Sequence, residues 1–262
     1  MRHLGPRFTV VANRALITVN MFTENVKPRG RGRPPGRTAQ GAAARDRLYH
    51  VATGLIAERG YEATTLREIA DRAGVSVGLL YRYFPNKRAI VLALYENLSR
   101  EYAEETAGMQ PGRWRDRFLF ALATSLRVLG PHRTTLRALV PVVVGDPEDG
   151  LFANATAFSR VRVAQAFQAA VTGATDAPPA VLADATGRLL YFVHLGVILL
   201  WLLDRTPSQR ATAGLVTLMR QILPSAALAL RLPAVRRFVR NADALFREAL
   251  FDDPGEGEIT AS

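Results

Sequence analysis

Residues 64–87, TTLREIADRAGVSVGLLYRYFPNK, carry the start, stop and core signals of two short helices joined by a very short turn. Thr65 precedes Glu68 by three residues, the spacing of a capping box, so we expect a helix to begin near Leu66. Gly74 follows its last core position, where glycine ends a helix at low cost. The inward positions at helical spacing are Leu66, Ile69, Ala70 and Ala73.

A second helix is expected over residues 77–83, because Ser76 is an N-cap candidate and Phe84-Pro85 disfavours continuation. The turn before Ser76 is too short for anything except two helices packed at a steep angle, which predicts a helix-turn-helix. Such a short helix does not persist alone, but anchored by Leu80 and Phe84 it can enter the DNA major groove. Its outer residues would then face base edges: Val77, Gly78, Leu79, Arg82 and Tyr83.

Asn86 is expected to cap a longer third helix, and Lys87 lies in the first turn of that helix. The charge of Lys87 and the open amides of a helix start both favour phosphate binding. We therefore expect a phosphate contact at Lys87.

Together with RDRLYHVATGLIAERGYEATTL before it and a long helix through Glu96 and Leu98 after it, this motif resembles the DNA-binding domain of the TetR family of bacterial repressors. The resemblance covers residues 42–102, with the helix-turn-helix motif at 65–84. It implies phosphate contacts from Thr65, Ser76, Tyr81 and Lys87. It also implies positions facing bases or neighbouring backbone: Arg67, Val77, Gly78, Leu79, Arg82 and Tyr83, the last being often His in the family.

An alternative interpretation comes from Gly74-Val75-Ser76-Val77-Gly78, which matches the G-x-S-x-G nucleophile elbow of esterases. That motif requires a strand before the serine, whereas here the preceding residues read as a capped amphipathic helix. The chain has no cysteine, and its four histidines show no metal-ligand spacing. We therefore expect no enzyme activity, no catalytic residues, no metal and no cofactor.

Positive charge is concentrated in the first part of the 262-residue chain. Residues 1–100 contain 17 Lys and Arg against 7 Asp and Glu, whereas the remainder contains 17 against 16. This distribution is typical of a protein that binds nucleic acid. Because Gly and Pro disfavour helix in KPRGRGRPPGR, residues 27–37, we expect residues 1–41 to form a disordered basic arm.

Arg31-Gly32-Arg33-Pro34 in this arm resembles an AT-hook, which implies that Arg31 and Arg33 enter the minor groove of A·T-rich DNA. A solvated linker is an equally weighted alternative. Met21 is a candidate start of translation, and the alternative is that residues 1–20 are a translated upstream region.

Residues 109–252 read as a helical regulatory and dimerisation domain, with breaks at Pro or Gly near 111, 130, 145–150, 173–179, 207, 224 and 233. Pro141 is expected to bend or break its helix. Nine large side chains are candidates for an apolar pocket, although simple core is the more common role of such residues: Phe118, Phe120, Leu122, Phe152, Phe158, Phe167, Tyr191, Phe192 and Trp201.

The apolar run 189–203 is shorter than the roughly 20 residues that span a bilayer, so we expect a dimer interface rather than a membrane span. Thr206, Pro207 and Gln209 are expected to be N-cap, N1 and N3 of a second interface helix. The apolar face of that helix is Leu215, Val216, Leu218, Met219 and Ile222. The segment also resembles the corresponding region of TetR-like regulators, and ordinary intrachain core is the alternative.

After Pro224, a basic amphipathic helix is expected to pack on the regulatory domain through Phe238, Leu245, Phe246 and Leu250, with membrane contact as the alternative. Residues 253–262 are expected to be a disordered tail.

The sequence thus predicts an all-α chain, in which a three-helix helix-turn-helix domain precedes a helical-bundle regulatory domain. Its predicted function is that of a cytoplasmic, nucleoid-associated repressor that binds palindromic double-stranded DNA as a homodimer and is released by a small apolar effector. The alternative is an architectural or regulatory DNA-binding protein without small-molecule input.

Overall fold

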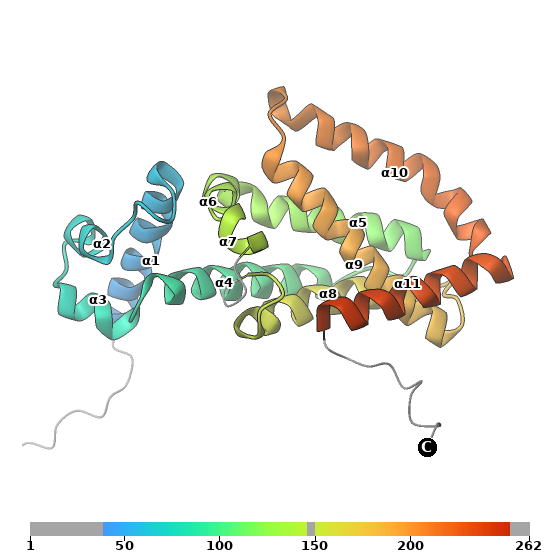
Figure 1. The fold of residues 1–262 in the computed structure, drawn as a ribbon, viewed down its shortest axis with the longest axis horizontal. Helices are drawn as coiled ribbons and strands as arrows, with labels where there is room; N and C mark the ends of the chain where they lie inside the picture. Colours follow the sequence, from blue (N-terminus) through green and yellow to red (C-terminus); the bar gives the residue numbers. More distant parts are fainter. Residues whose placement is uncertain (1–38, 146–149, 252–262) are drawn as a thin grey trace, which may run out of the picture. The chain divides into compact units, whose positions relative to one another are not determined.

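The computed structural model describes residues 39–145 and 150–251, and every regular element in these ranges is a helix. The all-α prediction is therefore confirmed. The arm with Arg31 and Arg33 and the tail 253–262 lie outside the described residues. Figure 1 shows the helices in chain order.

The amino-terminal part consists of α1 (Ala39–Arg59), α2 (Leu66–Ala73), α3 (Val77–Tyr83) and the first half of α4 (Lys87–Ala107). α1 begins three residues before the predicted domain boundary at 42. Side chains from all four helices form one buried core: Leu48, Leu55, Ile56, Ile69, Leu80, Phe84 and Ile90. This core holds α2 and α3 although both are too short to be stable alone.

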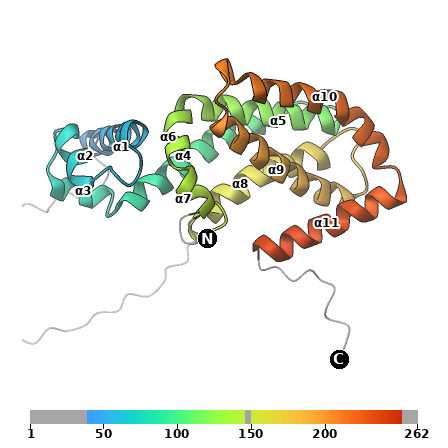
Figure 2. The ribbon, with the colours of Figure 1, turned by 45° about the horizontal axis from the view of Figure 1, so that its top comes forward.

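The rest of the described chain contains α5 (Trp114–Leu129), α6 (Arg133–Ala138), α7 (Val140–Gly145), α8 (Ala157–Thr172), α9 (Ala180–Leu203), α10 (Arg210–Ala229) and α11 (Pro233–Phe251). Short 3₁₀ turns lie at Gly130–His132, Asn154–Thr156 and Pro207–Gln209. α8 packs against α4, α5 and α9, whereas α10 packs along α5 and α9 (Figure 2). The predicted break at Pro141 is confirmed, because α6 ends at Ala138 and Pro141 lies in the first turn of α7.

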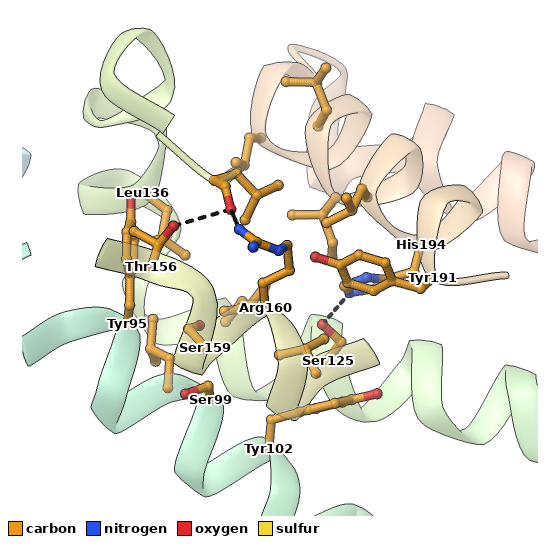
Figure 3. A pocket seen from close by; sticks show the side chains of 18 of the residues that line it. Tyr95, Ser99, Tyr102, Ser125, Leu136, Thr156, Ser159, Arg160, Tyr191 and His194 are labelled. Atoms are coloured by element: carbon orange, nitrogen blue, oxygen red, sulfur yellow. Dashed lines mark hydrogen bonds between the residues drawn. The ribbon is translucent and has the colours of Figure 1, made fainter. Parts of the chain in front are cut away.

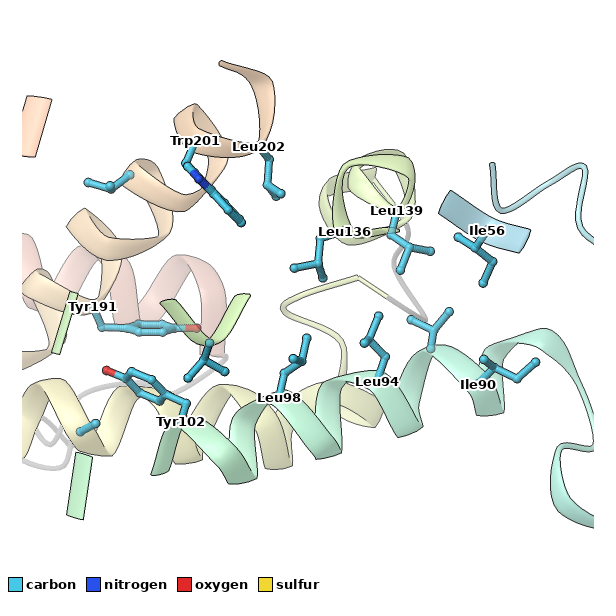
Figure 4. Close-up of a cluster of buried hydrophobic side chains, with 14 of the residues drawn as sticks. Ile56, Ile90, Leu94, Leu98, Tyr102, Leu136, Leu139, Tyr191, Trp201 and Leu202 are labelled. Atoms are coloured by element: carbon cyan, nitrogen blue, oxygen red, sulfur yellow. The ribbon is translucent and has the colours of Figure 1, made fainter. Parts of the chain in front are cut away.

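α4 belongs to both parts of the fold. Its apolar face continues from Ile90 and Leu94, beside α1, to Leu98 and Tyr102, beside α8 and α9 (Figure 4). Leu136 and Leu139 bring the α6 region onto the same strip of core. One continuous core therefore joins the two predicted domains.

Two predictions about α10 are wrong. Pro224 does not end its helix but lies within α10. It is exposed there, so water can satisfy the backbone carbonyl that a proline cannot bond. Gln209 is not the N3 residue of a capping box, because it has left-handed backbone angles (φ 53°) and α10 begins after it. Thr206, the predicted N-cap, does contribute, because its hydroxyl accepts a hydrogen bond from Ala211 N at 3.0 Å. Asp204 adds a second cap, accepting hydrogen bonds from Thr206 N and Thr212 N at 2.9 Å each.

α11 packs on α9 as expected, but through only part of the predicted stripe, because Phe246 stacks on Phe192 at a centroid distance of 4.6 Å. Phe238 and Leu245 are exposed, whereas Val239 and Asp243 are buried. Asp243 forms a bidentate ion pair with Arg188 of α9, with N–O distances of 2.7 and 2.6 Å. The ion pair turns the helix so that its acidic residue faces inward.

α9 has 24 residues and is long and apolar enough by itself to cross a membrane, which corrects the expectation that the apolar run is too short. The correction arises because the helix extends amino-terminally from the run to Ala180. A core helix satisfies the same criteria, and α9 buries Thr186 and His194 against neighbouring helices. Its most apolar stretch is 44% buried inside the fold.

Candidate functional site

The start of α2 is fixed by the predicted capping box. The Thr65 hydroxyl accepts a hydrogen bond from Glu68 N at 3.2 Å, and Glu68 Oε2 accepts one from Thr65 N at 3.2 Å. These bonds favour the carboxylate and lower the pKa of Glu68. Arg59, the last residue of α1, adds an ion pair to Glu68 at 2.6 Å. The exposed Thr65 hydroxyl is thus held at the surface where a phosphate contact is predicted.

The turn between α2 and α3 depends on Gly74, which has φ 65° and ψ 37°. Its N–H donates to the carbonyl oxygens of Ala70 and Asp71 and closes the end of α2. Nothing lies within 4 Å of an added Cβ, so the backbone angle rather than space requires glycine here.

α3 is capped and anchored as predicted. Ser76 Oγ accepts a hydrogen bond from Leu79 N at 3.2 Å, and Leu80 and Phe84 are 0% and 2% exposed. On the outer face, Val77 and Tyr81 are 37% and 52% exposed. α3 is therefore a short helix held from one side, with its other side open.

The remaining residues predicted to contact DNA differ in exposure. Arg67, Gly78 and Arg82 are exposed, whereas Leu79 and Tyr83 are partly buried, and Tyr83 packs against the core. A Cβ added at Gly78 would meet nothing within 4 Å. No packing contact in the described chain therefore requires a glycine at this position.

Lys87 has a role inside the chain that the sequence did not indicate. Its Nζ donates to the carbonyl oxygen of Tyr61 at 2.8 Å and lies 4.5 Å from the centre of the Tyr61 ring. Asn86 caps α4 as expected, because its Oδ1 accepts a hydrogen bond from Ala89 N at 2.9 Å. Lys87 thus joins the α1–α2 connection to α4, and its phosphate contact remains a prediction.

The esterase alternative lacks its structural requirement. α2, rather than a strand, precedes Ser76, and the Ser76 hydroxyl caps α3. A nucleophile elbow joins a strand to a helix, so this G-x-S-x-G sequence is a helix-turn-helix turn.

A second candidate site is a cavity of about 530 Å³ in the regulatory part, a volume within the range of small-molecule sites. Its wall comes from α4 to α9 and α11, and it is almost entirely apolar. Of the nine candidates proposed for an apolar pocket, three line it: Phe152, Tyr191 and Phe192. Phe118, Leu122, Phe167 and Trp201 are buried in the core, whereas Phe120 and Phe158 are exposed.

The polar side chains of the cavity were missed, because they come from helices far apart in the sequence. Figure 3 shows Tyr102 of α4, Ser125 of α5 and His194 of α9 at one end of the cavity. Ser125 Oγ lies 2.8 Å from His194 Nε2. Burial lowers the pKa of His194 to about 3, so the imidazole is neutral at physiological pH.

Comparison with known proteins gives one family match, to "Bacterial regulatory proteins, tetR family", over residues 48–94. The repressor KstR2 of Mycolicibacterium smegmatis is 44% identical over 57 residues, which are 22% of this chain and 28% of that protein. The activator FasR of the same organism is 32% identical over 117 residues, 43% of this chain and 46% of that protein. The matches thus span about a quarter to a half of these relatives.

A solved structure of a tetR-family transcriptional regulator from Streptomyces coelicolor covers more of the fold. It aligns with 77% of this chain and 90% of its own chain, with 26% identity and a TM-score of 0.53. The similarity therefore extends from the helix-turn-helix into the helical regulatory part.

Proposed function

Because this chain is a regulator of the TetR family, with a helix-turn-helix that binds DNA, we propose that it is a ligand-responsive transcriptional repressor. It binds a palindromic operator as a homodimer and is released by a small apolar effector. The observation that carries the proposal is α3, whose outer face is open while Leu80 and Phe84 fix its inner face.

In the proposed complex, α3 lies in the major groove. Thr65, Ser76, Tyr81 and the start of α4 at Lys87 hold phosphates and set the position of the protein on the duplex. Base edges and neighbouring backbone are contacted by Arg67, Val77, Gly78, Leu79, Arg82 and Tyr83. In the arm, Arg31 and Arg33 extend the contact into the minor groove.

The proposed dimer is supported by apolar side chains that α9 and α10 leave exposed: Val193, Leu200, Leu203, Leu218 and Ile222. Leu215, Val216 and Met219 of the predicted α10 face instead pack on the intrachain core. Covering the exposed set with the same helices of a second copy gives a four-helix interface. A two-fold axis then presents two α3 helices and requires two half-sites in the operator.

Effector control is supported by two elements that contact both the cavity and the DNA-binding part. α4 lines the cavity with Leu98 and Tyr102 and begins beside α3. Leu136 of α6 also lines the cavity, and its neighbour Thr135 donates a hydrogen bond to Thr53 O of α1 at 3.2 Å. An effector that prefers another arrangement of these helices shifts the population away from the DNA-binding state.

The proposal is tested by selecting bound fragments from a random DNA pool with the full-length protein. A palindromic consensus is the expected result. A·T-rich fragments without symmetry would favour the architectural alternative. No enrichment of any sequence would contradict sequence-specific DNA binding. A protein that binds DNA in this way would be located in the cytoplasm, associated with the nucleoid.

The role of α3 is tested with Tyr81→Ala on the recovered operator. Loss of its proposed phosphate contact should weaken binding about tenfold, the effect of losing a charge-assisted hydrogen bond. Phe120→Ala, at an exposed aromatic residue of α5, is the matched control and should bind as wild type. Equal affinities for all three proteins would contradict the proposed docking.

A further inference from the structure

The polar groups toward one side of the cavity already have partners. Arg160 Nη1 donates to the carbonyl oxygens of Leu151 and Ala153 at 3.0 and 3.3 Å. The Thr156 hydroxyl donates to Gly150 O at 2.8 Å. It also donates to Leu151 O at 3.1 Å, the oxygen that Arg160 contacts (Figure 3). Among the described lining residues, Arg160 is the only Lys or Arg, and none is Asp or Glu. The cavity therefore offers a charged ligand few interactions to offset the hydration that its charge loses on binding.

The end of the cavity near Ser125 is different. Tyr102 Oη and His194 Nδ1 are buried side-chain atoms with no hydrogen-bond partner, and the two residues are only 2% and 4% exposed. Both rings pack on Phe167, at centroid distances of 6.2 and 4.6 Å. Tyr102 and His194 both line the apolar cavity, and each has one buried polar atom with unused hydrogen-bonding capacity.

An unpaired polar atom is costly to bury, so a ligand that supplies the missing bonds gains binding free energy here. The Tyr102 hydroxyl can donate and accept. The neutral imidazole of His194 has two tautomers. If Nε2 accepts the Ser125 hydroxyl proton, Nδ1 carries the ring proton and is a donor; if Nε2 donates to Ser125, Nδ1 is an acceptor. A ligand hydroxyl satisfies both tautomers, and a ligand carbonyl satisfies the one with a proton on Nδ1.

We propose that the cavity binds an uncharged, predominantly apolar molecule through one hydroxyl or carbonyl oxygen, which hydrogen-bonds to Tyr102 Oη and His194 Nδ1. This inference rests on the proposed effector site and gives that site its ligand chemistry. The carbon skeleton of the ligand fills the apolar remainder of the cavity, and the oxygen sets its orientation.

Charged molecules of the same shape are disfavoured for a physical reason. A carboxylate beside Tyr102 and His194 loses its hydration, while the guanidinium of Arg160 is engaged with two carbonyl oxygens. An ammonium group finds no carboxylate among the described lining residues. Selectivity for an uncharged oxygen is therefore a second consequence of the lining.

The test is a matched series of ten-carbon probes: 1-decanol, 2-decanone, decane, decanoate and decylamine. Each is titrated calorimetrically, from cyclodextrin, into the full-length wild type, Tyr102→Phe and the control Tyr49→Phe. Tyr49 is a buried tyrosine of α1 that does not line the cavity. Comparing one probe between variants cancels differences in hydrophobicity between probes.

We expect Tyr102→Phe to weaken binding of the alcohol and the ketone about fivefold, as for the loss of one hydrogen bond, and to leave decane unchanged. Tyr49→Phe should bind every probe as wild type. The thermal midpoint of ligand-free Tyr102→Phe should not fall, because its missing hydroxyl has no protein partner. This readout separates loss of a ligand contact from loss of the fold.

Equal affinities of wild type and Tyr102→Phe for the alcohol and ketone would overturn the proposal. Tighter binding of decanoate or decylamine than of both uncharged oxygenated probes, or no binding of any probe, would also overturn it. Operator release is measured separately with the selected DNA. Binding as expected without release leaves the ligand subsite intact and contradicts effector-controlled repression, so the two proposals fail in different assays.

Discussion

Gly78 lies inside the seven-residue helix α3, although glycine is the least favourable residue there apart from proline. Because no atom of the described chain comes within 4 Å of an added Cβ, the free space is available to DNA. We expect Gly78→Ala to raise the free energy of unfolding by about 0.5–1 kcal/mol and to weaken operator binding. Urea unfolding and fluorescence anisotropy with labelled operator measure the two effects.

The matched control is Gly54→Ala in α1, another helical glycine with nothing within 4 Å of its added Cβ. It should stabilise the fold similarly and leave operator affinity unchanged. If Gly78→Ala also binds the operator as wild type, the DNA does not approach α3 at this position.

His194 makes the free energy of unfolding depend on pH through a single residue. Its pKa is lowered to about 3 in the folded chain, whereas an exposed histidine has a pKa of about 6.5. Between these values the unfolded state binds more protons, so the free energy of unfolding falls as the pH falls below about 6.5. The slope approaches about 1.4 kcal/mol per pH unit.

His194→Gln keeps a hydrogen-bonding amide opposite Ser125 but does not titrate. Urea unfolding of both proteins at several pH values should therefore show the wild type losing stability relative to the variant in acid. Other histidines, such as His132, whose pKa burial also lowers, are common to both proteins and cancel in the difference. Parallel stability curves would show that His194 does not stay neutral in the folded state.

At the scale of elements, α2, α3 and the start of α4 were predicted from the sequence to the residue. This was possible because their limits depend on local signals: Thr65 with Glu68, Gly74, Ser76 and Asn86. The wrong predictions have two kinds of cause, a local one in α10 and a distant one at α11. At the start of α10, Asp204 joins the predicted cap Thr206 and accepts a hydrogen bond from Thr212, only eight residues away. At α11, Asp243 faces inward because of Arg188, which is 55 residues away in the sequence.

The cavity lining shows the same limit. Phe152, Tyr191 and Phe192 were among the candidates as large apolar side chains, but Tyr102 and His194 become neighbours only when α4 and α9 pack around Phe167 of α8. Sequence periodicity gives the buried face of one helix and carries no information on which helix covers it.

α10 provides a prediction for the dimer. Ile222 is 66% exposed on this helix, where the proposed interface covers it. Burying a charge without a partner costs several kcal/mol, so Ile222→Glu should be largely monomeric at micromolar concentration and bind the palindrome weakly. Sedimentation velocity measures the oligomeric state.

The control is Leu245→Glu, at a residue 65% exposed on α11. Because α11 has no part in the proposed interface, this variant should sediment as wild type. A monomeric wild type, or a dimer that tolerates Ile222→Glu, would contradict the α9–α10 interface.

At the scale of the whole molecule, charge separates the chain into a basic amino-terminal part and a nearly neutral remainder. Residues 27–37 contribute five Lys and Arg. Each phosphate neutralised on duplex DNA adds about 0.9 to the slope of log affinity against log salt. Deleting residues 1–38 should therefore weaken operator binding and reduce that slope by about 2 or more.

Arg31→Lys with Arg33→Lys separates minor-groove recognition from simple charge. The double variant keeps the net charge, so the salt slope should remain while the preference for A·T-rich flanks decreases. Unchanged affinity and slope after the deletion would exclude a DNA-binding role for the arm.

α4 has a consequence for engineering, because its 21 residues serve both the DNA-binding part and the cavity. Each residue of an α-helix advances about 1.5 Å and turns about 100°. A single residue inserted between Leu94 and Leu98 would therefore rotate α3 by more than a quarter turn relative to the cavity. Hybrid regulators that join this cavity to another protein's recognition helix must therefore preserve the residue count along α4, which fixes the rotation between the two parts.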